Sequence, residues 1–259
     1  MKIKITDTHK CDKFVAIFQQ LKTLSSSLCW QIDEDSITVQ GMDQGHVSMF
    51  QLVLGNTWFD TYEHVSGDLP VFHICSTLLA KFLNIRSDHQ TIDISLDENA
   101  DKIKIRFESD DKAEFNKALS LSLMDAEQES LNIPEMEYTA EFILQSKKLN
   151  SLVDQLSLMN DIVEIHCDEE TIKLKTEGLE GIMEVSIPHD DIEEYIIDED
   201  TSVDVSYSLN YMKKFCQYHR VSETVELQIS EQYPLMVTYK LNALNYLKFY
   251  LAPKMDDNE

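Results

Sequence analysis

Two runs of consecutive acidic residues are the first candidates in this sequence for metal binding or catalysis. Consecutive carboxylates occur at 33–35 and 168–170, and acidic clusters hold Mg²⁺ in nucleases. Each run lies between two alternating stretches that predict a hairpin, where consecutive side chains diverge. His166 and Cys167 are neighbours in a strand pattern, so their side chains point to opposite faces. These patterns predict solvated turns and an ordinary strand rather than a metal site.

Sequence motifs that carry catalysis are absent. The chain has no GxxxxGK[ST] phosphate loop, no HExxH pattern and no GxSxG nucleophile elbow, and it has only six glycines to build a phosphate cradle. Its five cysteines are scattered and never spaced as CxxC, which predicts neither a zinc site nor a disulfide framework. We expect a protein that is not an enzyme and that needs no cofactor or metal.

Net charge is the property that fits a nucleic-acid function least well. The 259 residues include 22 basic and 47 acidic side chains, giving −25, whereas nucleic-acid binders are usually basic. A DNA function therefore requires the lysines to gather on one surface. The hydrophobic content of 43% is typical of folded domains, and no run has the length of a membrane span. The first residues lack the apolar core of a signal peptide, so we expect an intracellular protein.

Alternating and helical patterns divide the first half into short elements. Residues 1–5 predict a strand, and Phe14, Ile17, Phe18 and Leu21 predict an amphipathic helix. Strands are expected at 30–32, 36–42 and 46–54, a second short helix at 78–83, and a hairpin from 91–96 and 102–107.

The second half repeats this order of elements. A strand at 138–144 precedes a helix at 149–156, a hairpin (163–167 and 171–176) and strands at 183–187 and 202–207. A helix at 209–216, a hairpin (224–230 and 234–241) and a last strand at 246–251 complete it. The period of half the chain predicts a duplicated α+β domain.

The segment between the copies is acidic and reads as an extended connector. We predict an N-terminal domain at 1–122, the connector at 123–137 and a C-terminal domain at 138–259. Leu131 and Ile133 stand out in the connector because no strand or helix pattern accounts for these apolar residues.

Each predicted helix carries a lysine near the face opposite its apolar stripe. The remaining acidic residues concentrate in the predicted turns and connectors, including 193–200. This segregation is what a DNA-facing surface would need, although lysines also favour solvated helix faces in general, and Asp12 and Asp154 share these faces. The lysines on or beside these faces are Lys13, Lys22, Lys81, Lys147 and Lys214.

Four segments resemble the proliferating cell nuclear antigen family of sliding clamps. They are residues 28–54, which contain Met-Asp, two residues and then His-Val; FDTYE at 59–63; residues 122–138; and YLKFYLAPKMDD at 246–257. Similarity in length and element order covers essentially the whole chain.

The resemblance implies two alike clamp domains, with three subunits joined head to tail in a closed ring around duplex DNA. It also implies that subunits pair edge strands near 112–121 and near 172–181 of the neighbour, with Phe115, Leu119 and Gly178 at the seam. The alternative for Phe115 and Leu119 is an amphipathic helix within one domain. Helices would line the hole, and short motifs of partner proteins would bind outside it.

The resemblance also implies a peptide-binding pocket, into which a partner motif inserts aliphatic and aromatic anchors. Val47, Met49 and Leu251 could instead belong to a domain core. The expected pocket residues are Met42, His46, Val47, Met49, Leu131, Ile133, Pro234, Tyr250, Leu251, Ala252 and Pro253.

The helix faces hold fewer basic residues than clamps of this family usually have. Neutral or acidic residues such as Ala16, Asn84 and Ser151 occupy several of these positions. The expected affinity for DNA is therefore low, but a closed ring does not need tight contacts. The expected DNA-facing residues are Lys22, Lys81, Lys147, Lys148, Lys213 and Lys214.

The function implied is that of a replication clamp, which binds a DNA polymerase, a clamp loader and other motif-bearing replication and repair proteins. A homotrimer in the nucleus is the family's usual state, with a viral or archaeal replication site if the source is not eukaryotic. Two alternatives remain open: a specialised checkpoint-type clamp subunit in a hetero-ring, and, because of the charge of −25, an acidic DNA mimic.

Overall fold

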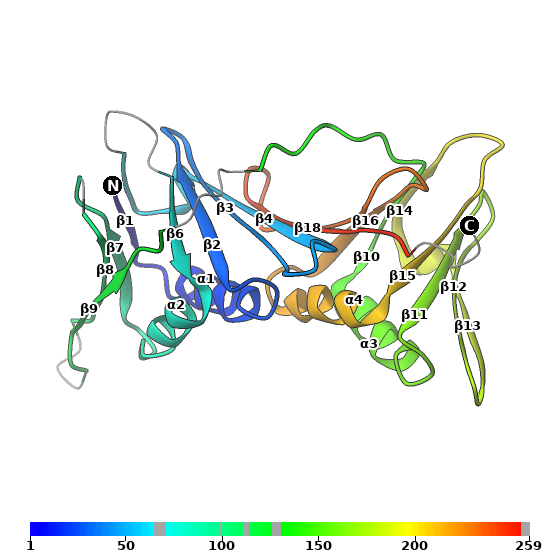
Figure 1. The fold of residues 1–259 in the computed structure, drawn as a ribbon, viewed down its shortest axis with the longest axis horizontal. Helices are drawn as coiled ribbons and strands as arrows, with labels where there is room; N and C mark the ends of the chain where they lie inside the picture. Colours follow the sequence, from blue (N-terminus) through cyan, green and yellow to red (C-terminus); the bar gives the residue numbers. More distant parts are fainter. Residues whose placement is uncertain (65–70, 99, 111–113, 126–130, 255–259) are drawn as a thin grey trace. The chain divides into compact units, whose positions relative to one another are not determined.

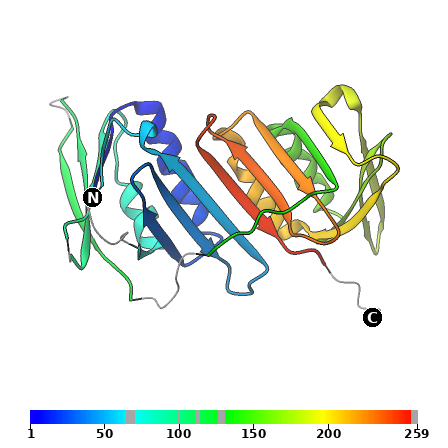
Figure 2. The same cartoon turned by 90° about the horizontal axis from the view of Figure 1, so that it is seen from above.

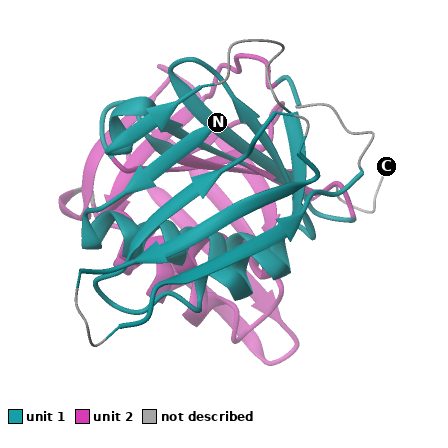
Figure 3. Cartoon of the chain, turned by 90° about the vertical axis from the view of Figure 1, so that its left-hand side faces the viewer, with its two compact units in different colours: residues 1–44, 51–132, 242–246 teal, residues 45–50, 133–241, 247–259 magenta. Residues whose placement is uncertain are grey.

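A computed structural model describes residues 1–64, 71–98, 100–110, 114–125 and 131–254. The chain forms two compact units (Figure 3). Unit 1 contains Met1–Gln44, Gln51–Asn132 and Asn242–Tyr246, and unit 2 contains Gly45–Phe50, Ile133–Leu241 and Leu247–Glu259.

Unit 1 contains a five-stranded antiparallel sheet and a second set of strands (Figure 1). The sheet has the order β5-β1-β7-β8-β9, formed by β5 (Thr61–Glu63), β1 (Lys2–Ile5), β7 (Thr91–Ser95), β8 (Lys102–Glu108) and β9 (Lys117–Ser122). The second set has the order β4-β3-β2-β6, formed by β4 (Ser48–Gly55), β3 (Ser36–Met42), β2 (Ser27–Ile32) and β6 (Val71–Cys75).

Unit 2 has the same two kinds of strand set. One has the order β14-β10-β16-β17-β18, formed by β14 (Ile192–Ile197), β10 (Ala140–Gln145), β16 (Thr224–Ile229), β17 (Leu235–Lys240) and β18 (Tyr246–Leu251). The other has the order β13-β12-β11-β15, formed by β13 (Gly181–Ile187), β12 (Ile172–Gly178), β11 (Ile162–Cys167) and β15 (Val203–Ser208).

Two helices pack together in each unit, α1 (Thr8–Leu21) with α2 (Ser76–Leu83) and α3 (Ser146–Leu156) with α4 (Leu209–Cys216). Figure 2 shows α1 and α2 behind the strands of unit 1. Helix α1 begins where the carboxylate of Asp7 accepts a hydrogen bond from the backbone N–H of Lys10 at 2.8 Å, which caps the first turn. No helix in the described part of the chain is both long and apolar enough to cross a membrane.

Aromatic side chains bind helix to strand in both cores. In unit 1, Phe18 of α1 stacks on Trp30 of β2 with ring centroids 5.3 Å apart. In unit 2, Phe215 of α4 stacks on Phe249 of β18 at 4.8 Å. These four side chains are at most 1% exposed, so each helix is held by its apolar stripe, as the helical spacing predicts.

The predicted duplication is confirmed by the order of elements. Each half of the chain runs strand, helix, three strands, 3₁₀ helix, two strands, helix, three strands. The 3₁₀ helices are η1 (Asn56–Trp58) and η2 (His189–Asp191), and the second half adds η3 (Gln217–Arg220) after α4. All four predicted helices are present. The described connector residues 131–137 belong to no helix or strand, while 126–130 lie outside the described residues.

Three expectations about strands are wrong. Strands β5 and β6 were not predicted, and the acidic stretch 193–200, expected as a turn or connector, contains most of β14. The stretch 172–181 was expected to form an open edge, but β12 pairs with β11 on one side and β13 on the other. The outer strand of that sheet is β13. The expectation failed because the pairing partners of a strand depend on the whole sheet and not on the local sequence pattern.

Candidate functional site

Leu131 of the connector is held against β3 by one buried side chain. The Nε2 of Gln40 donates to the carbonyl oxygen of Leu131 at 2.9 Å, and the N–H of Leu131 donates to Oε1 of Gln40 at 2.8 Å. Gln40 is 4% exposed, whereas the Leu131 side chain is 41% exposed. Met42 is half-buried and lies two residues further along β3, on the same face as Gln40. Unit 1 therefore holds Leu131 beside the strand that carries Met42.

The other predicted pocket residues belong to unit 2. The N–H of Ala252 donates to the carbonyl oxygen of Val47 at 2.9 Å, so the end of the chain runs beside the segment before β4. Val47 is 37% exposed and His46 is exposed with a left-handed φ of 57°, which turns the chain tightly here. The half-buried members are Met49, Ile133, Pro234, Ala252 and Pro253.

Two predicted pocket residues are buried. Leu251 has no exposed surface and Tyr250 is 5% exposed. The sequence left open whether Leu251 belongs to the pocket or to a domain core, and its burial favours the core. The surface that this strand end offers comes from Ala252 and Pro253, beyond the last residue of β18.

The six predicted DNA-facing lysines divide into two groups of three. Lys22, Lys81 and Lys147 are exposed on or beside their helices, and the described structure gives none of them an ion pair. The other three have partners. The Lys148 ammonium pairs with Asp191, the Lys213 Nζ lies 3.7 Å from the Asp154 carboxylate, and the Lys214 Nζ lies 5.1 Å from the centre of the Tyr211 ring.

Both acidic residues on the predicted lysine faces are also paired. Asp154 has Lys213, and Asp12 of α1 pairs with Arg86, whose side chain is 4% exposed. These pairs offset the negative charges that would repel phosphate. Among the six predicted DNA-facing lysines, the positive charges without an ion-pair partner in the described structure are those of Lys22, Lys81 and Lys147.

The outer strand β9 of unit 1 is anchored at its start. Gln90, which is 1% exposed, donates from Nε2 to the carbonyl oxygen of Phe115 at 2.9 Å. The Lys117 Nζ donates to the carbonyl oxygen of Ile85 at 2.8 Å and to Ser87 Oγ at 2.7 Å. The Phe115 side chain nevertheless projects into solvent, with 86% of its surface exposed.

Leu119 is half-buried in the middle of β9. The segment is a strand and not the alternative amphipathic helix, so alternate side chains of β9 face opposite sides of the sheet.

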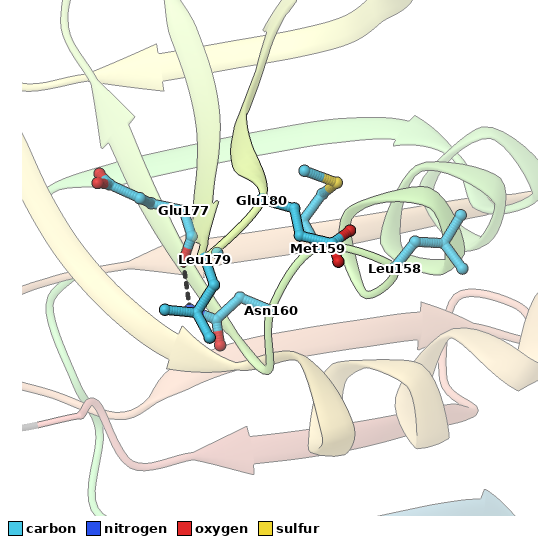
Figure 4. Close-up of a pocket in the computed structure, with 7 residues that line it drawn as sticks. Leu158, Met159, Asn160, Glu177, Leu179 and Glu180 are labelled. Carbon is cyan, nitrogen blue, oxygen red and sulfur yellow. Dashed lines mark hydrogen bonds between the residues drawn. The ribbon is translucent and has the colours of Figure 1, made fainter.

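The predicted interface glycine, Gly178, lies at the turn between β12 and β13. A Cβ on Gly178 would lie 2.2 Å from the carbonyl oxygen of Met159, so only glycine fits. An open groove of about 690 Å³ lies at this turn. Figure 4 shows residues that line it. Its lining is Leu158, Met159, Asn160, Glu177, Gly178, Leu179 and Glu180.

The acidic turns have structural uses. The Oδ1 of Asp168 accepts hydrogen bonds from the backbone N–H groups of Glu170 at 2.8 Å and Thr171 at 2.7 Å, which closes the β11–β12 turn. The hydrogen bond from His166 Nε2, followed by these N–H groups, lowers the pKa of Asp168 to about 2. Within the described residues, no group of three acidic, histidine or cysteine side chains is placed to hold a metal ion.

His166 lies between two carboxylates on the surface of unit 2. Its Nε2 is 3.0 Å from Asp168 Oδ2 and its Nδ1 is 2.8 Å from Asp204 Oδ1. The hydrogen bonds to Asp168 and then Asp204 raise the pKa of His166 above its ordinary value. Cys167 is fully buried on the opposite face, as the strand pattern predicted.

Comparison with known proteins places both halves of the chain in one group. Residues 8–130 match the family model described as "Proliferating cell nuclear antigen, N-terminal domain", and residues 132–254 match "Proliferating cell nuclear antigen, C-terminal domain". The two matches meet within a residue or two of the division between Asn132 and Ile133. A protein named "Proliferating cell nuclear antigen" from Chaetomium thermophilum is 28% identical over 251 residues, covering 94% of this chain and 95% of that protein.

Proposed function

Since this chain belongs to the proliferating cell nuclear antigen family and is a DNA sliding clamp, we propose that it works as a closed homotrimer that encircles duplex DNA and recruits proteins through short peptide motifs. The observation that carries the proposal is the repeat of one element order in both halves of the chain, each matched by its own family domain. We assign the domains to residues 1–122 and 138–259, with the connector at 123–137. Proteins of this family are clamps, and we propose that this chain likewise carries out no chemistry itself.

Ring closure in this proposal uses the outer strands β9 and β13. Each leaves one row of backbone N–H and C=O groups without a strand partner in its described sheet, and such edges invite pairing with another chain. Pairing β9 of one copy with β13 of the next is head to tail, and an interface of this kind closes into a ring when the rotation per subunit suits. Phe115 and Leu119 on one side, and the Gly178 turn on the other, would lie at the seam.

DNA binding in this proposal is weak and electrostatic. Lys22, Lys81 and Lys147 would supply the main contacts to phosphate, because their charges have no ion-pair partner in the described structure. Lys148, Lys213 and Lys214 would contribute less, since each already has a partner. Weak contacts suit a clamp, because closure of the ring prevents escape while loose phosphate contacts allow sliding.

Partner recruitment in this proposal uses predicted pocket residues of unit 1 and of unit 2 that are exposed or half-buried. Leu131 and Met42 would contact apolar anchors of the motif, and the strand end at Ala252 and Pro253 would pair with an extended part of the peptide. Methionine and aliphatic side chains adapt to several partners, which suits a platform. A DNA polymerase, a clamp loader and other motif-bearing replication and repair proteins are the expected partners, and the nucleus, or a viral or archaeal replication site, is the expected location.

One alternative from another class is favoured by a specific observation. A net charge of −25 would suit an acidic DNA mimic that occupies nucleic-acid-binding proteins. A checkpoint-type subunit of a hetero-ring is the alternative within the same fold. One chain carries the predicted pocket residues both at 42–49 and at 250–253. This favours a homotrimer over a hetero-ring in which different subunits have different functions.

The mass of the purified protein in solution separates these functions. Light scattering coupled to gel filtration should give three times the 30.0 kDa mass of the chain. A single-chain mass combined with tight binding to basic proteins would support the DNA mimic instead. A trimer that forms only after addition of different clamp subunits would support the checkpoint-type function.

A further inference from the structure

Gln40 is the residue that holds Leu131 of the connector in place, and we infer that it positions the apolar lip of the peptide site before a partner arrives. The inference rests on the proposed function, because it gives Gln40 a role in the same binding surface. Gln40 need not touch the peptide. It is a positioning residue that acts through the backbone of Leu131.

The pair of hydrogen bonds has the geometry of a strand pair. The amide of Gln40 both donates to Leu131 and accepts from it, at 2.9 Å and 2.8 Å, as two opposed residues of an antiparallel ladder do. The two residues are 91 positions apart in the sequence, and both belong to unit 1. The side chain itself comes from β3, where Gln40 lies opposite Cys29 of β2, so the anchor is part of a paired sheet.

Connector residues 132–137 lack such a tether. Among residues 131–137, Leu131 is the one whose backbone N–H and C=O bond to the rest of the chain. The next backbone hydrogen bond along the chain is from Thr139 to the carbonyl oxygen of Ile229 at 3.0 Å. Removing the Gln40 amide would therefore free Leu131 and the residues that follow it.

The two hydrogen bonds should fix the position of the Leu131 side chain and contribute little to the free energy of unfolding. The Leu131 residue is exposed, so water could satisfy its backbone groups if the amide were absent. What water cannot supply is a fixed place for the Leu131 side chain. A binding surface that is in place for only a fraction of the time binds with an affinity reduced by that fraction.

The size of the effect follows from two hydrogen bonds of ordinary net strength. Removing both should weaken binding of a motif peptide by about 5- to 150-fold. The thermal midpoint and the mass of the assembly should stay close to those of the unaltered protein, because methionine has nearly the volume of glutamine and leaves no unpaired polar group in the buried site.

Gln40→Met and a matched control test the inference in the full-length protein. The control is Gln31→Met on the neighbouring strand β2, where the half-buried glutamine reaches only the Asp33 carboxylate at 3.4 Å and does not touch the connector. The probe is a synthetic peptide that carries one aliphatic and one aromatic anchor on a single helical turn. Calorimetry gives the peptide affinity, and hydrogen exchange gives the protection of the Leu131 amide.

We expect Gln40→Met to speed exchange at Leu131 and to weaken the peptide, while Gln31→Met changes neither. If Gln40→Met does not fold, Gln40→Glu serves instead, because it keeps the volume but sets a carboxylate oxygen against the Leu131 carbonyl. Equal peptide affinities for the variant and the unaltered protein would overturn the inference, as would unchanged exchange at Leu131.

Failure of the proposed function gives a different pattern. Suppose that Gln40→Met speeds exchange at the Leu131 amide but the unaltered protein does not bind the peptide. The peptide site itself is then misassigned. The inference then falls with it, and the exchange data show that the tether between Gln40 and the connector was intact.

Discussion

Replacing Phe115 with arginine should break the proposed ring into single chains. The side chain is 86% exposed in the isolated chain, and a phenylalanine buries about 150 to 250 Å² when it is covered. At about 25 cal/mol per Å², covering the exposed part contributes about 3 to 5 kcal/mol at each seam, before ordering costs are subtracted. A ring of three chains has three seams, so Phe115→Arg removes this contribution three times and also places a charge in a closing interface.

Sedimentation velocity over a range of concentrations measures the outcome. Leu244→Arg is a matched control, because Leu244 is an exposed leucine in the turn between β17 and β18 and belongs to neither β9 nor β13. The control should sediment as a trimer at concentrations where Phe115→Arg sediments as single chains. Circular dichroism should show that both variants are folded, since neither side chain belongs to a core.

The seam has a second side that can be altered independently. Ile182 is the exposed apolar residue at the start of β13, at 59% exposure. Ile182→Arg should therefore produce single chains as well. If Phe115→Arg keeps the same trimer as Leu244→Arg at every concentration, the placement of the seam at β9 is wrong.

The remaining predictions concern the peptide site, the DNA face and pH. Ile133→Ser should weaken a motif peptide by about 1 to 3 kcal/mol in calorimetry without changing the thermal midpoint, and an equal affinity would remove the connector from the site. Charge reversal of Lys22, Lys81 and Lys147 should lower the salt slope of DNA association by about 0.9 for each phosphate that a lysine no longer neutralises, and an unchanged slope would place them elsewhere. Because its two aspartate partners raise the pKa of His166 above 6.5, the stability from this ion-paired cluster is complete below that pH and declines as pH rises through the raised pKa. The thermal midpoint should therefore fall with rising pH in that window, and His166→Gln should flatten the change; a variant that keeps the full pH dependence would refute this cause.

The spacing of apolar residues predicted most of the helices and strands, because each of these elements buries one face. The helical spacing of Phe14, Ile17, Phe18 and Leu21 is the stripe that α1 buries, and the alternation at 102–107 is the buried face of β8. Strand β6 was missed because three consecutive residues, Phe72, His73 and Ile74, are buried, so its pattern does not alternate.

Long-range contacts account for what the sequence could not predict. The resemblance placed the open edge at 172–181, which is mostly β12 and not β13, and the strand pattern could not correct it because such a pattern does not say whether its second side is paired. Lys148 reads as a free lysine in the sequence, yet its partner Asp191 is 43 residues away. The bond between Gln40 and Leu131 spans 91 residues, and no sequence pattern connects them.

A test of threading over DNA ends addresses the central claim directly. A closed ring that encircles duplex DNA must enter and leave linear DNA over its ends, because its grip is topological and its phosphate contacts are weak. The measurement compares the protein retained on a linear duplex with free ends and on the same duplex with both ends blocked by bound streptavidin, at a salt concentration that screens surface charges. The clamp assignment predicts retention that depends on whether the blocks are added before or after the protein. Equal association with free-ended and pre-blocked DNA would show that the protein binds along the duplex without encircling it, and would contradict the clamp assignment.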